Sequence, residues 1–333
     1  MPVLNVAFIG SEEFAKSLGK KGDVRDVESF VHKETKDDDA HILSFIRPLR
    51  HPERLRPLLS VLNVAKAGIV EITKVDAALG EILVAFGSAG IQHGHVIISP
   101  EEGGWVDSEQ VKLILNQAKL DNWTIHDSKP DEHELRTSLF ELMDLLSSER
   151  EIDESSPLVI PVDQHFNVKG VGLVAIGYVQ SGTISKHDEI VVLPVKENGI
   201  ARSLQVMDDD VNQSKTGDRV GVALRNLREE ALHRGCILTH NDSEALEKHN
   251  NSSFCLTLAP FQKRKLEKGD VIHGAVDLQF IVGRIVSANE NKLMVEWEQP
   301  LWIRKLDPEP LIIVQLDAGN MRIMGVADNL QQE

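Results

Sequence analysis

Cysteine and long apolar runs are both scarce in this sequence. Its 333 residues include two cysteines, Cys236 and Cys255. Two cysteines provide neither a disulfide framework nor the paired spacing of a metal site, so we expect both to be small buried apolar residues. No apolar run approaches the roughly 20 residues that span a bilayer, and the N-terminus lacks the layout of a secretion signal. These absences predict a cytoplasmic protein without a membrane partner, long enough for two or three domains.

Basic residues are also in deficit. Lysine and arginine together number 36 against 52 aspartate and glutamate residues, which gives a formal net charge of -16. Because phosphate contacts need positive side chains, such acidity slows the encounter with a polyanion. The densest basic cluster lies within residues 262–268 and contains Lys263, Arg264 and Lys265. This cluster fits either a contact with an RNA backbone or a solvated loop, and we expect no DNA partner.

Short apolar runs separated by glycine-containing turns dominate the second half of the chain. Residues 158–162 and 172–179 form two such runs, and Gly170 and Gly172 lie in the turn between them. Another apolar run, at 190–193, follows a turn at 180–182. Glycines at these positions allow a sharp bend or a close backbone approach. Short strands with this spacing are typical of a small antiparallel barrel.

The residues of these runs also carry a resemblance to a known family. Residues 162–184 read VDQHFNVKGVGLVAIGYVQSGTI, followed by KTGDRVGVALRN at 215–226 and RGCILTH at 234–240. These strings resemble the second domain of translational GTPases of the elongation factor Tu and SelB type. The segments VIHGAVDLQFIVGRIV at 271–286 and MVEWEQPLWI at 294–303 resemble the third domain of that family. The chain is also similar to the SelB-like factors of methanogenic archaea proposed to serve pyrrolysine, which implies an archaeal protein.

The resemblance implies an α/β plus β architecture. An N-terminal P-loop-GTPase-like α/β domain with degenerate motifs, at 1–147, would precede two antiparallel β-barrels at 158–247 and 252–333. The acidic segment 148–157 has the composition of a solvated linker between the first two parts. Within the first domain, periodic apolar residues predict helices at 107–118 and 131–147.

Residues 10–17 resemble a P-loop that has been damaged. Gly10, Lys16 and Ser17 keep the offsets of G-x-x-x-x-G-K-[ST], but Ala15 replaces the second glycine and Glu12 adds a negative charge outside the family pattern. In an intact loop, backbone N–H groups hold phosphates, the lysine neutralises them and the hydroxyl binds Mg²⁺. The resemblance therefore implies that Gly10, Ala15, Lys16 and Ser17 contact GTP or GDP, with Ser17 on Mg²⁺, and the changes predict weakened binding.

The other nucleotide motifs have changed further. Where the family has D-x-P-G-H, residues 47–51 read RPLRH, so that only His51 matches, at the position of the water-orienting catalytic histidine. A short polar stretch between Ser17 and a strand at 41–46 lacks the family's switch segment, and SPEEGG at 99–104 stands where the guanine-reading motif belongs. These losses predict that GTP binding and hydrolysis are weak or absent, and they leave open whether the protein is an enzyme.

The barrel retains residues that correspond to the family's aminoacyl-tRNA pocket. In this family, the aminoacyl end of a tRNA lies between the first domain and the second-domain barrel. Asp163, Phe166 and Arg219 match positions of that pocket, and the arginine is the SelB-like choice. A pair formed by Asp163 and Arg219 fits recognition of the charged end of an amino acid, or a structural ion pair at the mouth of the barrel.

Two functions are consistent with the sequence. The first is a SelB-like elongation factor that binds aminoacyl-tRNA through its barrels, with the ribosome as a further partner. The second is a pseudo-GTPase scaffold or regulator that binds a protein partner through the same clefts. A basic face that combines residues 263–268 with the Arg234 loop would favour the first function.

Overall fold

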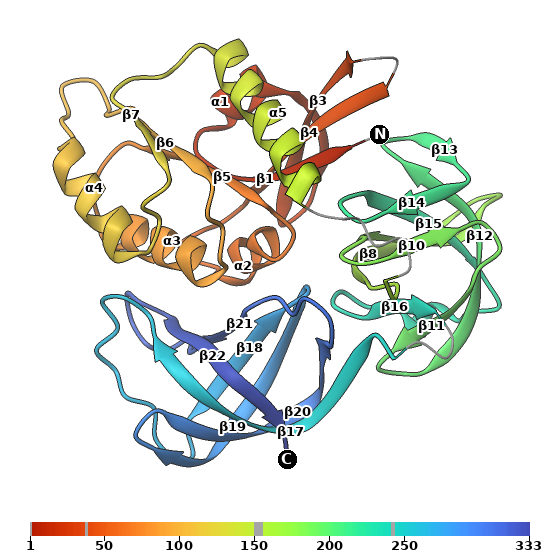
Figure 1. The fold of residues 1–333 in the computed structure, drawn as a ribbon. Helices are drawn as coiled ribbons and strands as arrows, with labels where there is room; N and C mark the ends of the chain where they lie inside the picture. The colour runs from red at the N-terminus through yellow and green to blue at the C-terminus, as the bar shows by residue number, and fades with distance from the viewer. Residues whose placement is uncertain (1, 37–38, 150–155, 241–243) are drawn as a thin grey trace.

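The computed structural model describes residues 2–36, 39–149, 156–240 and 244–333. It contains an N-terminal α/β domain followed by two β-barrels, and this arrangement confirms the predicted fold class (Figure 1). Most of the predicted acidic linker, residues 150–155, lies outside the described residues. No helix in the described part of the chain is long and apolar enough to cross a membrane.

The N-terminal domain is a seven-stranded sheet in the order β2-β3-β4-β1-β5-β6-β7. Strands β1, β4, β5, β6 and β7 are parallel. Their central residues are mostly buried and apolar, as expected for a parallel sheet that helices cover on both faces. The strands are β1 (Val3–Ile9), β2 (Lys20–Val24), β3 (Val27–Lys36), β4 (Asp39–Pro48), β5 (Ala67–Ile72), β6 (Gly94–Ile98) and β7 (Thr124–His126).

Five helices cover this sheet. Buried residues of α1 and α5 pack in one apolar cluster, and those of α2, α3 and α4 pack in another on the opposite face. Each of α3 and α4 begins at an aspartate, Asp76 or Asp107, whose carboxylate accepts a backbone N–H of the first turn. The helices are α1 (Glu12–Leu18), α2 (Arg56–Leu62), α3 (Ala77–Ser88), α4 (Ser108–Gln117) and α5 (Glu132–Glu149), and the last two confirm the predicted helices.

One part of this domain differs from the prediction. The polar stretch after Ser17 forms the strands β2 and β3, a hairpin at the edge of the sheet. Strand β3 pairs with β4 in unbroken antiparallel register from Val27 opposite Pro48 to Lys36 opposite Asp39. The prediction was wrong because most residues of the hairpin are polar, while the pairing with β4 supplies the backbone hydrogen bonds that hold β3.

The first barrel closes through the pairing of β11 with β12, and β13 extends it at one edge. Its interior is a cluster of aliphatic side chains and Cys236. A short ribbon of β10 and β14 and a 3₁₀ turn, η1 (Glu229–Ala231), complete it. The strands are β8 (Ile160–Val168), β9 (Gly172–Tyr178), β10 (Thr183–Ser185), β11 (Glu189–Leu193), β12 (Glu197–Val206), β13 (Asp209–Val211), β14 (Gln213–Lys215), β15 (Arg219–Arg225) and β16 (Ile237–His240).

The C-terminal barrel is closed in the order β17-β20-β19-β18-β21-β22. It lies beneath helices α2 and α3 of the first domain (Figure 1), and their apolar side chains share one buried cluster with Ile312, Val314 and Ile323 of the barrel. Ion pairs between Glu81 and Arg322 and between Lys66 and Glu309 border this contact. The strands are β17 (Leu246–Leu258), β18 (Val271–Val276), β19 (Gln279–Asn289), β20 (Lys292–Arg304), β21 (Leu311–Val314) and β22 (Ile323–Gln332).

Candidate functional site

Most of the segment that resembles a damaged P-loop, residues 10–17, lies in a helix. Helix α1 begins at Glu12, directly after its N-cap Ser11, so that Ala15, Lys16 and Ser17 are all helical. The Ala15 N–H donates to the Ser11 carbonyl (3.1 Å), and the Ser17 hydroxyl donates to the Phe14 carbonyl (2.9 Å). The ammonium group of Lys16 lies 2.8 Å from the Glu12 carboxylate. The groups that would bind phosphate and Mg²⁺ in a P-loop therefore have partners within their own helix.

Side chains of the protein also occupy the space in front of Gly10. The carboxylate of Glu71, near the end of β5, accepts the Ser11 N–H at 2.6 Å. A Cβ atom on residue 10 would lie 2.9 Å from Glu71, so the glycine is what permits this approach. Arg47, on β4, donates from Nε to the Gly10 carbonyl (2.7 Å) and forms an ion pair with Glu28. The loop after β1 is thus held by one carboxylate and one guanidinium group of the same chain.

His51 is bound to the neighbouring helix rather than facing solvent. Its Nε2 lies 3.1 Å from the Glu81 carboxylate on α3. Glu81 also accepts the backbone N–H (2.8 Å) and the Nε–H (3.0 Å) of Arg322 from the C-terminal barrel. Burial alone would raise the pKa of Glu81, but the hydrogen bonds from His51 and Arg322 hold it at about 2. His51 therefore belongs to a charge network that joins two domains.

A cavity of about 360 Å³ remains at the carboxyl end of β1, β4 and β5. This edge of a parallel sheet is where α/β proteins usually bind ligands. Its charged lining mixes both signs, since Arg47 and Lys74 face Glu71 and Asp76. The charged residues that line it are therefore balanced in sign rather than predominantly positive.

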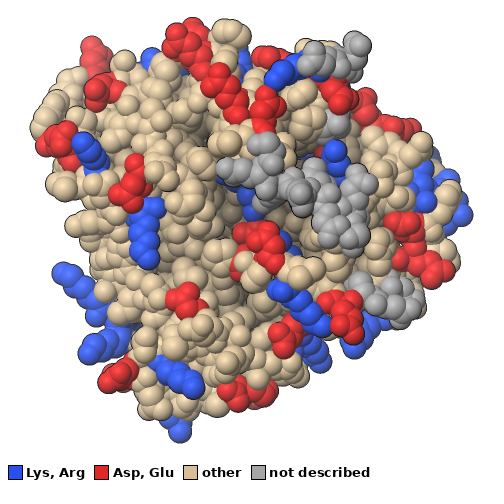
Figure 2. Space-filling model, viewed as in Figure 1, with Lys and Arg blue, Asp and Glu red and all other residues tan. Residues whose placement is uncertain are grey.

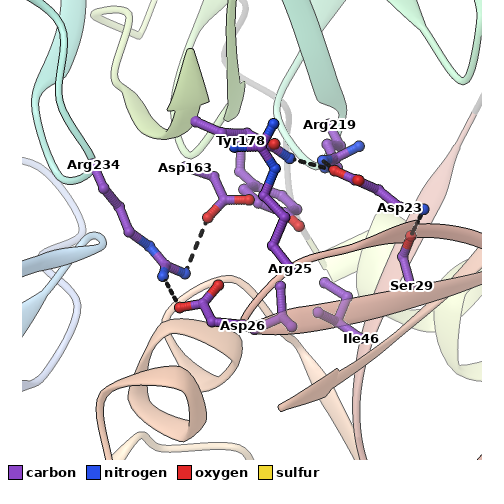
Figure 3. A pocket seen from close by; sticks show the side chains of 11 residues that line it. Asp23, Arg25, Asp26, Ser29, Ile46, Asp163, Tyr178, Arg219 and Arg234 are labelled. Atoms are coloured by element: carbon purple, nitrogen blue, oxygen red, sulfur yellow. Dashed lines mark hydrogen bonds and ion pairs between the residues drawn. The ribbon is translucent and has the colours of Figure 1, made fainter. Parts of the chain in front are cut away.

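A second cavity, of about 270 Å³, lies between the N-terminal domain and the first barrel. The hairpin tip supplies Asp23, Arg25 and Asp26, which point toward the barrel (Figure 3). The barrel contributes Asp163 from β8, Arg219 from β15 and Arg234 from the loop before β16. Three arginines and three aspartates thus line one small space, together with Tyr178 and the apolar side chains of Val27 and Ile46.

The ion pairs in this cavity differ from the predicted pair. Asp163 and Arg219 line the same space, but Asp163 pairs with Arg234 (3.0 Å) and Arg219 pairs with Asp23 (3.4 Å). Arg234 also pairs with Asp26 of the hairpin. The difference arises because the hairpin tip and the Arg234 loop bring closer partners than the two barrel residues offer each other.

Burial leaves part of this polar lining incompletely bonded. Burial raises the pKa of Asp163, although the charges of Arg234 and Arg219 oppose this rise. Burial also raises the pKa of Tyr178 to about 12. Gln164 donates its amide N–H to Asp23 (2.6 Å), whereas its buried Oε1 has no hydrogen-bond partner among the described residues. The cavity can therefore offer an acceptor and paired charges to a small polar ligand.

The remaining predicted site residues lie outside the cavity. Phe166, on β8, packs under the Arg25 guanidinium group at 5.9 Å. Lys263 and Lys265 are exposed in the loop between β17 and β18, while Arg264 lies 4.0 Å from Asp270 and 3.9 Å from Asp317. On the face shown in Figure 2, basic and acidic side chains are interspersed. The predicted basic cluster is thus partly neutralised by its own surroundings.

Five residues of these two sites were not predicted from the sequence: Asp23, Arg25, Asp26 and Glu28 of the hairpin, and Glu71 of β5. The string KKGDVRDVE at 20–28 contains a signal for the hairpin, because a glycine and an aspartate between charged, alternating residues are typical of a turn. Nothing near Glu71 in the sequence indicates its contact with Ser11, which lies 60 positions away along the chain.

Comparison with known proteins gives a consistent set of relatives. Residues 172–239 match the family model for elongation factor Tu domain 2. The uncharacterized protein MJ0325 of Methanocaldococcus jannaschii is 30% identical over 327 residues, which is 98% of this chain and 99% of that protein. The selenocysteine-specific elongation factor of the same organism is 39% identical over 187 residues, 56% of this chain but only 36% of that factor.

Solved structures share the fold at lower identity. A bacterial selenocysteine-specific elongation factor, EF-Sec, has a TM-score of 0.76 at 20% identity, covering 98% of this chain and 58% of that one. The elongation factor SelB of Methanococcus maripaludis, in complex with the GTP analogue GPPNHP, has a TM-score of 0.74 at 18% identity. That match covers 100% of this chain and 80% of SelB. The order of the three domains is therefore shared, while the chain spans little more than half of the bacterial factor.

Proposed function

Because this chain belongs to the family of translational GTPases of the elongation factor Tu and SelB type, we propose that it binds aminoacyl-tRNA. The aminoacyl end would enter the 270 Å³ cavity between the hairpin tip and the first barrel. We further propose that this binding does not depend on GTP, because the residues that would hold the nucleotide are engaged elsewhere.

The polar lining of the cavity is the observation that carries the proposal. An aminoacyl ester presents an amino group that donates hydrogen bonds and a carbonyl oxygen that accepts them. The unpartnered Oε1 of Gln164 and the carboxylate of Asp163 suit the amino group, and the guanidinium of Arg219 suits the carbonyl. Asp163 and Arg219 already have ion-pair partners in the cavity, whereas burying the Gln164 Oε1 without a partner among the described residues is costly, and a bound hydrogen-bond donor would offset that cost.

The N-terminal domain supports nucleotide-independent binding. A phosphate placed at Gly10 would meet the carboxylate of Glu71, which already accepts the Ser11 N–H. At roughly 5 Å and an effective dielectric constant of about 20, each such repulsion costs about 3 kcal/mol before screening. Lys16 cannot compensate without leaving its ion pair with Glu12. We therefore expect weak or absent binding of GTP and GDP, with or without Mg²⁺, and no efficient hydrolysis.

One surface feature favours the alternative, a pseudo-GTPase that binds a protein partner. The loop after β6 presents Trp105, which is 81% exposed, and the same loop contains the exposed residues Glu101 and Glu102. Leu113, on the following helix α4, is 63% exposed. Exposed aromatic side chains of this kind are enriched at protein interfaces.

The test is protection of the aminoacyl ester against hydrolysis. A mixture of total aminoacyl-tRNA is incubated with the protein without nucleotide, and the loss of each amino acid is followed. The wild-type protein should slow hydrolysis of at least one ester. Arg219→Met should weaken that protection about tenfold or more, because hydrogen bonds to charged groups contribute about 1.5–3 kcal/mol. Asp163→Asn should act in the same direction.

Arg225→Met is the matched control, because Arg225 lies on the same strand β15 but is exposed outside the cavity. It should leave the protection unchanged. Absence of protection for every aminoacyl-tRNA at micromolar protein would refute the proposal and favour the protein-binding alternative. Calorimetric titration tests the second part: micromolar, guanine-selective binding of GTP would contradict nucleotide independence.

A further inference from the structure

The hairpin β2–β3 shapes the cavity but makes few backbone contacts through its first strand. Strand β3 is held by its full-length pairing with β4. Strand β2 pairs with β3 at three positions only, with an irregularity between Lys21 and Val24, and all five of its residues are exposed. The tip itself is held by two backbone hydrogen bonds, from the Arg25 N–H to the Val27 carbonyl (2.8 Å) and from the Leu49 N–H to the Asp26 carbonyl (2.9 Å). The placement of β2 therefore depends largely on side-chain contacts.

A chain of ion pairs close to the tip of the hairpin provides these contacts. Glu28, on β3, is only 3% exposed and pairs with both Lys21 of β2 (3.0 Å) and Arg47 of β4. Lys21 also lies 2.6 Å from Glu12, the first residue of helix α1. Glu28 is thus the buried junction at which an exposed strand, the edge of the sheet and the first helix are connected.

The other end of β2 reaches the cavity. Asp23 accepts the amide of Gln164 and pairs with Arg219, and Asp26 pairs with Arg234 (Figure 3). Only one residue, Gly22, separates Lys21 from Asp23. We therefore expect a displacement of Lys21 to shift the Asp23 carboxylate, which closes the cavity against Arg219.

We propose that Glu28 is a positioning residue that keeps the hairpin tip closed over the cavity in the absence of any nucleotide. Through Arg47, which also donates to the Gly10 carbonyl, it joins the closed tip to the loop after β1. The side-chain contacts that hold the hairpin tip therefore all come from the protein itself. The identity of the ligand in the closed cavity rests on the function proposed above. The role of Glu28 in closing the cavity does not depend on that function.

The test is amide hydrogen exchange of the full-length protein with Glu28→Gln. The substitution keeps the size of the side chain but removes the charge that Lys21 and Arg47 share. Breaking a buried ion pair is strongly destabilising, and local opening limits amide exchange. We therefore expect the amides of residues 20–26 to exchange on the order of tenfold to 100-fold faster in Glu28→Gln than in the wild-type protein. The amides of the β3–β4 ladder should change little, and addition of millimolar GTP and Mg²⁺ to the wild-type protein should not slow exchange at the tip.

The same strand offers a matched control. Glu34 is also a glutamate of β3 with a nearby side-chain partner, His32 (2.8 Å), but its side chain is exposed, so Glu34→Gln should leave the tip unchanged. Lys21→Met removes only one partner of Glu28 and should open the tip less than Glu28→Gln does. This milder variant also keeps the test valid if Glu28→Gln folds poorly.

Ester protection measured on the same variants separates the two proposals. If Glu28→Gln leaves exchange at residues 20–26 unchanged, the positioning role is overturned, whatever the wild-type protein binds. If exchange at the tip slows markedly with GTP and Mg²⁺, the nucleotide-independent closure is overturned. If the tip opens as expected but the wild-type protein protects no ester, the role of Glu28 is supported and the proposed tRNA function fails.

Discussion

Replacing Glu81 by glutamine should weaken the contact between the N-terminal domain and the C-terminal barrel. The Glu81 side chain is 2% exposed and receives three hydrogen bonds from Arg322 and one from His51. Glutamine has nearly the same shape, but it carries no charge and presents one oxygen instead of two. The substitution therefore leaves the partly buried guanidinium of Arg322 without its counter-ion.

The magnitude follows from the pKa of Glu81. Its carboxyl group has a pKa of about 2 in the folded protein against an ordinary value of 4.5. At about 1.4 kcal/mol for each tenfold change in proton affinity, the carboxylate contributes about 3 kcal/mol to stability at neutral pH. Because the folded-state pKa is lowered, this contribution is complete above pH 4.5 and is lost as the pH falls from 4.5 toward 2.

Urea unfolding of wild-type and Glu81→Gln proteins between pH 2.5 and 7 measures this contribution. The control is Glu197→Gln, because Glu197 receives the same backbone N–H, Nε and Nη2 bonds from Arg228, whose side chain is 80% exposed. Solvent screens that pair, so its loss should have a much smaller effect. The reasoning is wrong if both variants lose equal stability at pH 7, or if the effect of Glu81→Gln is the same at pH 2.5 and pH 6.

Two further pairs of positions test local features of the structure. In helix α3, Gly80→Ala should stabilise the protein by about 0.5–1 kcal/mol, because alanine favours helices and, outside the helix's own backbone, no described residue lies within 4 Å of the new methyl group. Gly87→Ala in the same helix should destabilise the protein by about 1–3 kcal/mol or more, because its Cβ would lie 1.8 Å from the Ala118 carbonyl oxygen. Thermal unfolding measures both changes in stability. If both substitutions stabilise the protein, or both destabilise it, the packing described here is contradicted. Of the two cysteines, the half-buried Cys255 should react with a thiol reagent in the folded protein. Cys236 should react only after unfolding, because it is fully buried and burial raises its pKa to about 11. Rapid labelling of both thiols under native conditions would contradict this expectation.

The charges that line the cavity were the least predictable part of the molecule. Asp163 and Arg219 were found from a motif, but their partners were not. Asp26 lies 208 positions from Arg234, and Asp23 lies 141 positions from Gln164. A charged residue carries no periodicity that points to its counter-ion, and with 52 acidic and 36 basic residues the chain allows many pairings.

The sequence by itself determined the fold class, because short apolar runs, turn glycines and helical periodicity are local patterns. The loss of the nucleotide motifs stays a prediction. Gly170 and Gly172 adopt positive φ angles of 85° and 102° in the turn where glycine was required, and the apolar runs around them became the strands β8 and β9. The tertiary structure alone decided that the polar segment after Ser17 pairs with β4, that Glu71 reaches Ser11, and that the hairpin tip meets the barrel. These contacts join residues far apart in the chain, and their energies depend on burial and distance, which exist only once the domains have packed.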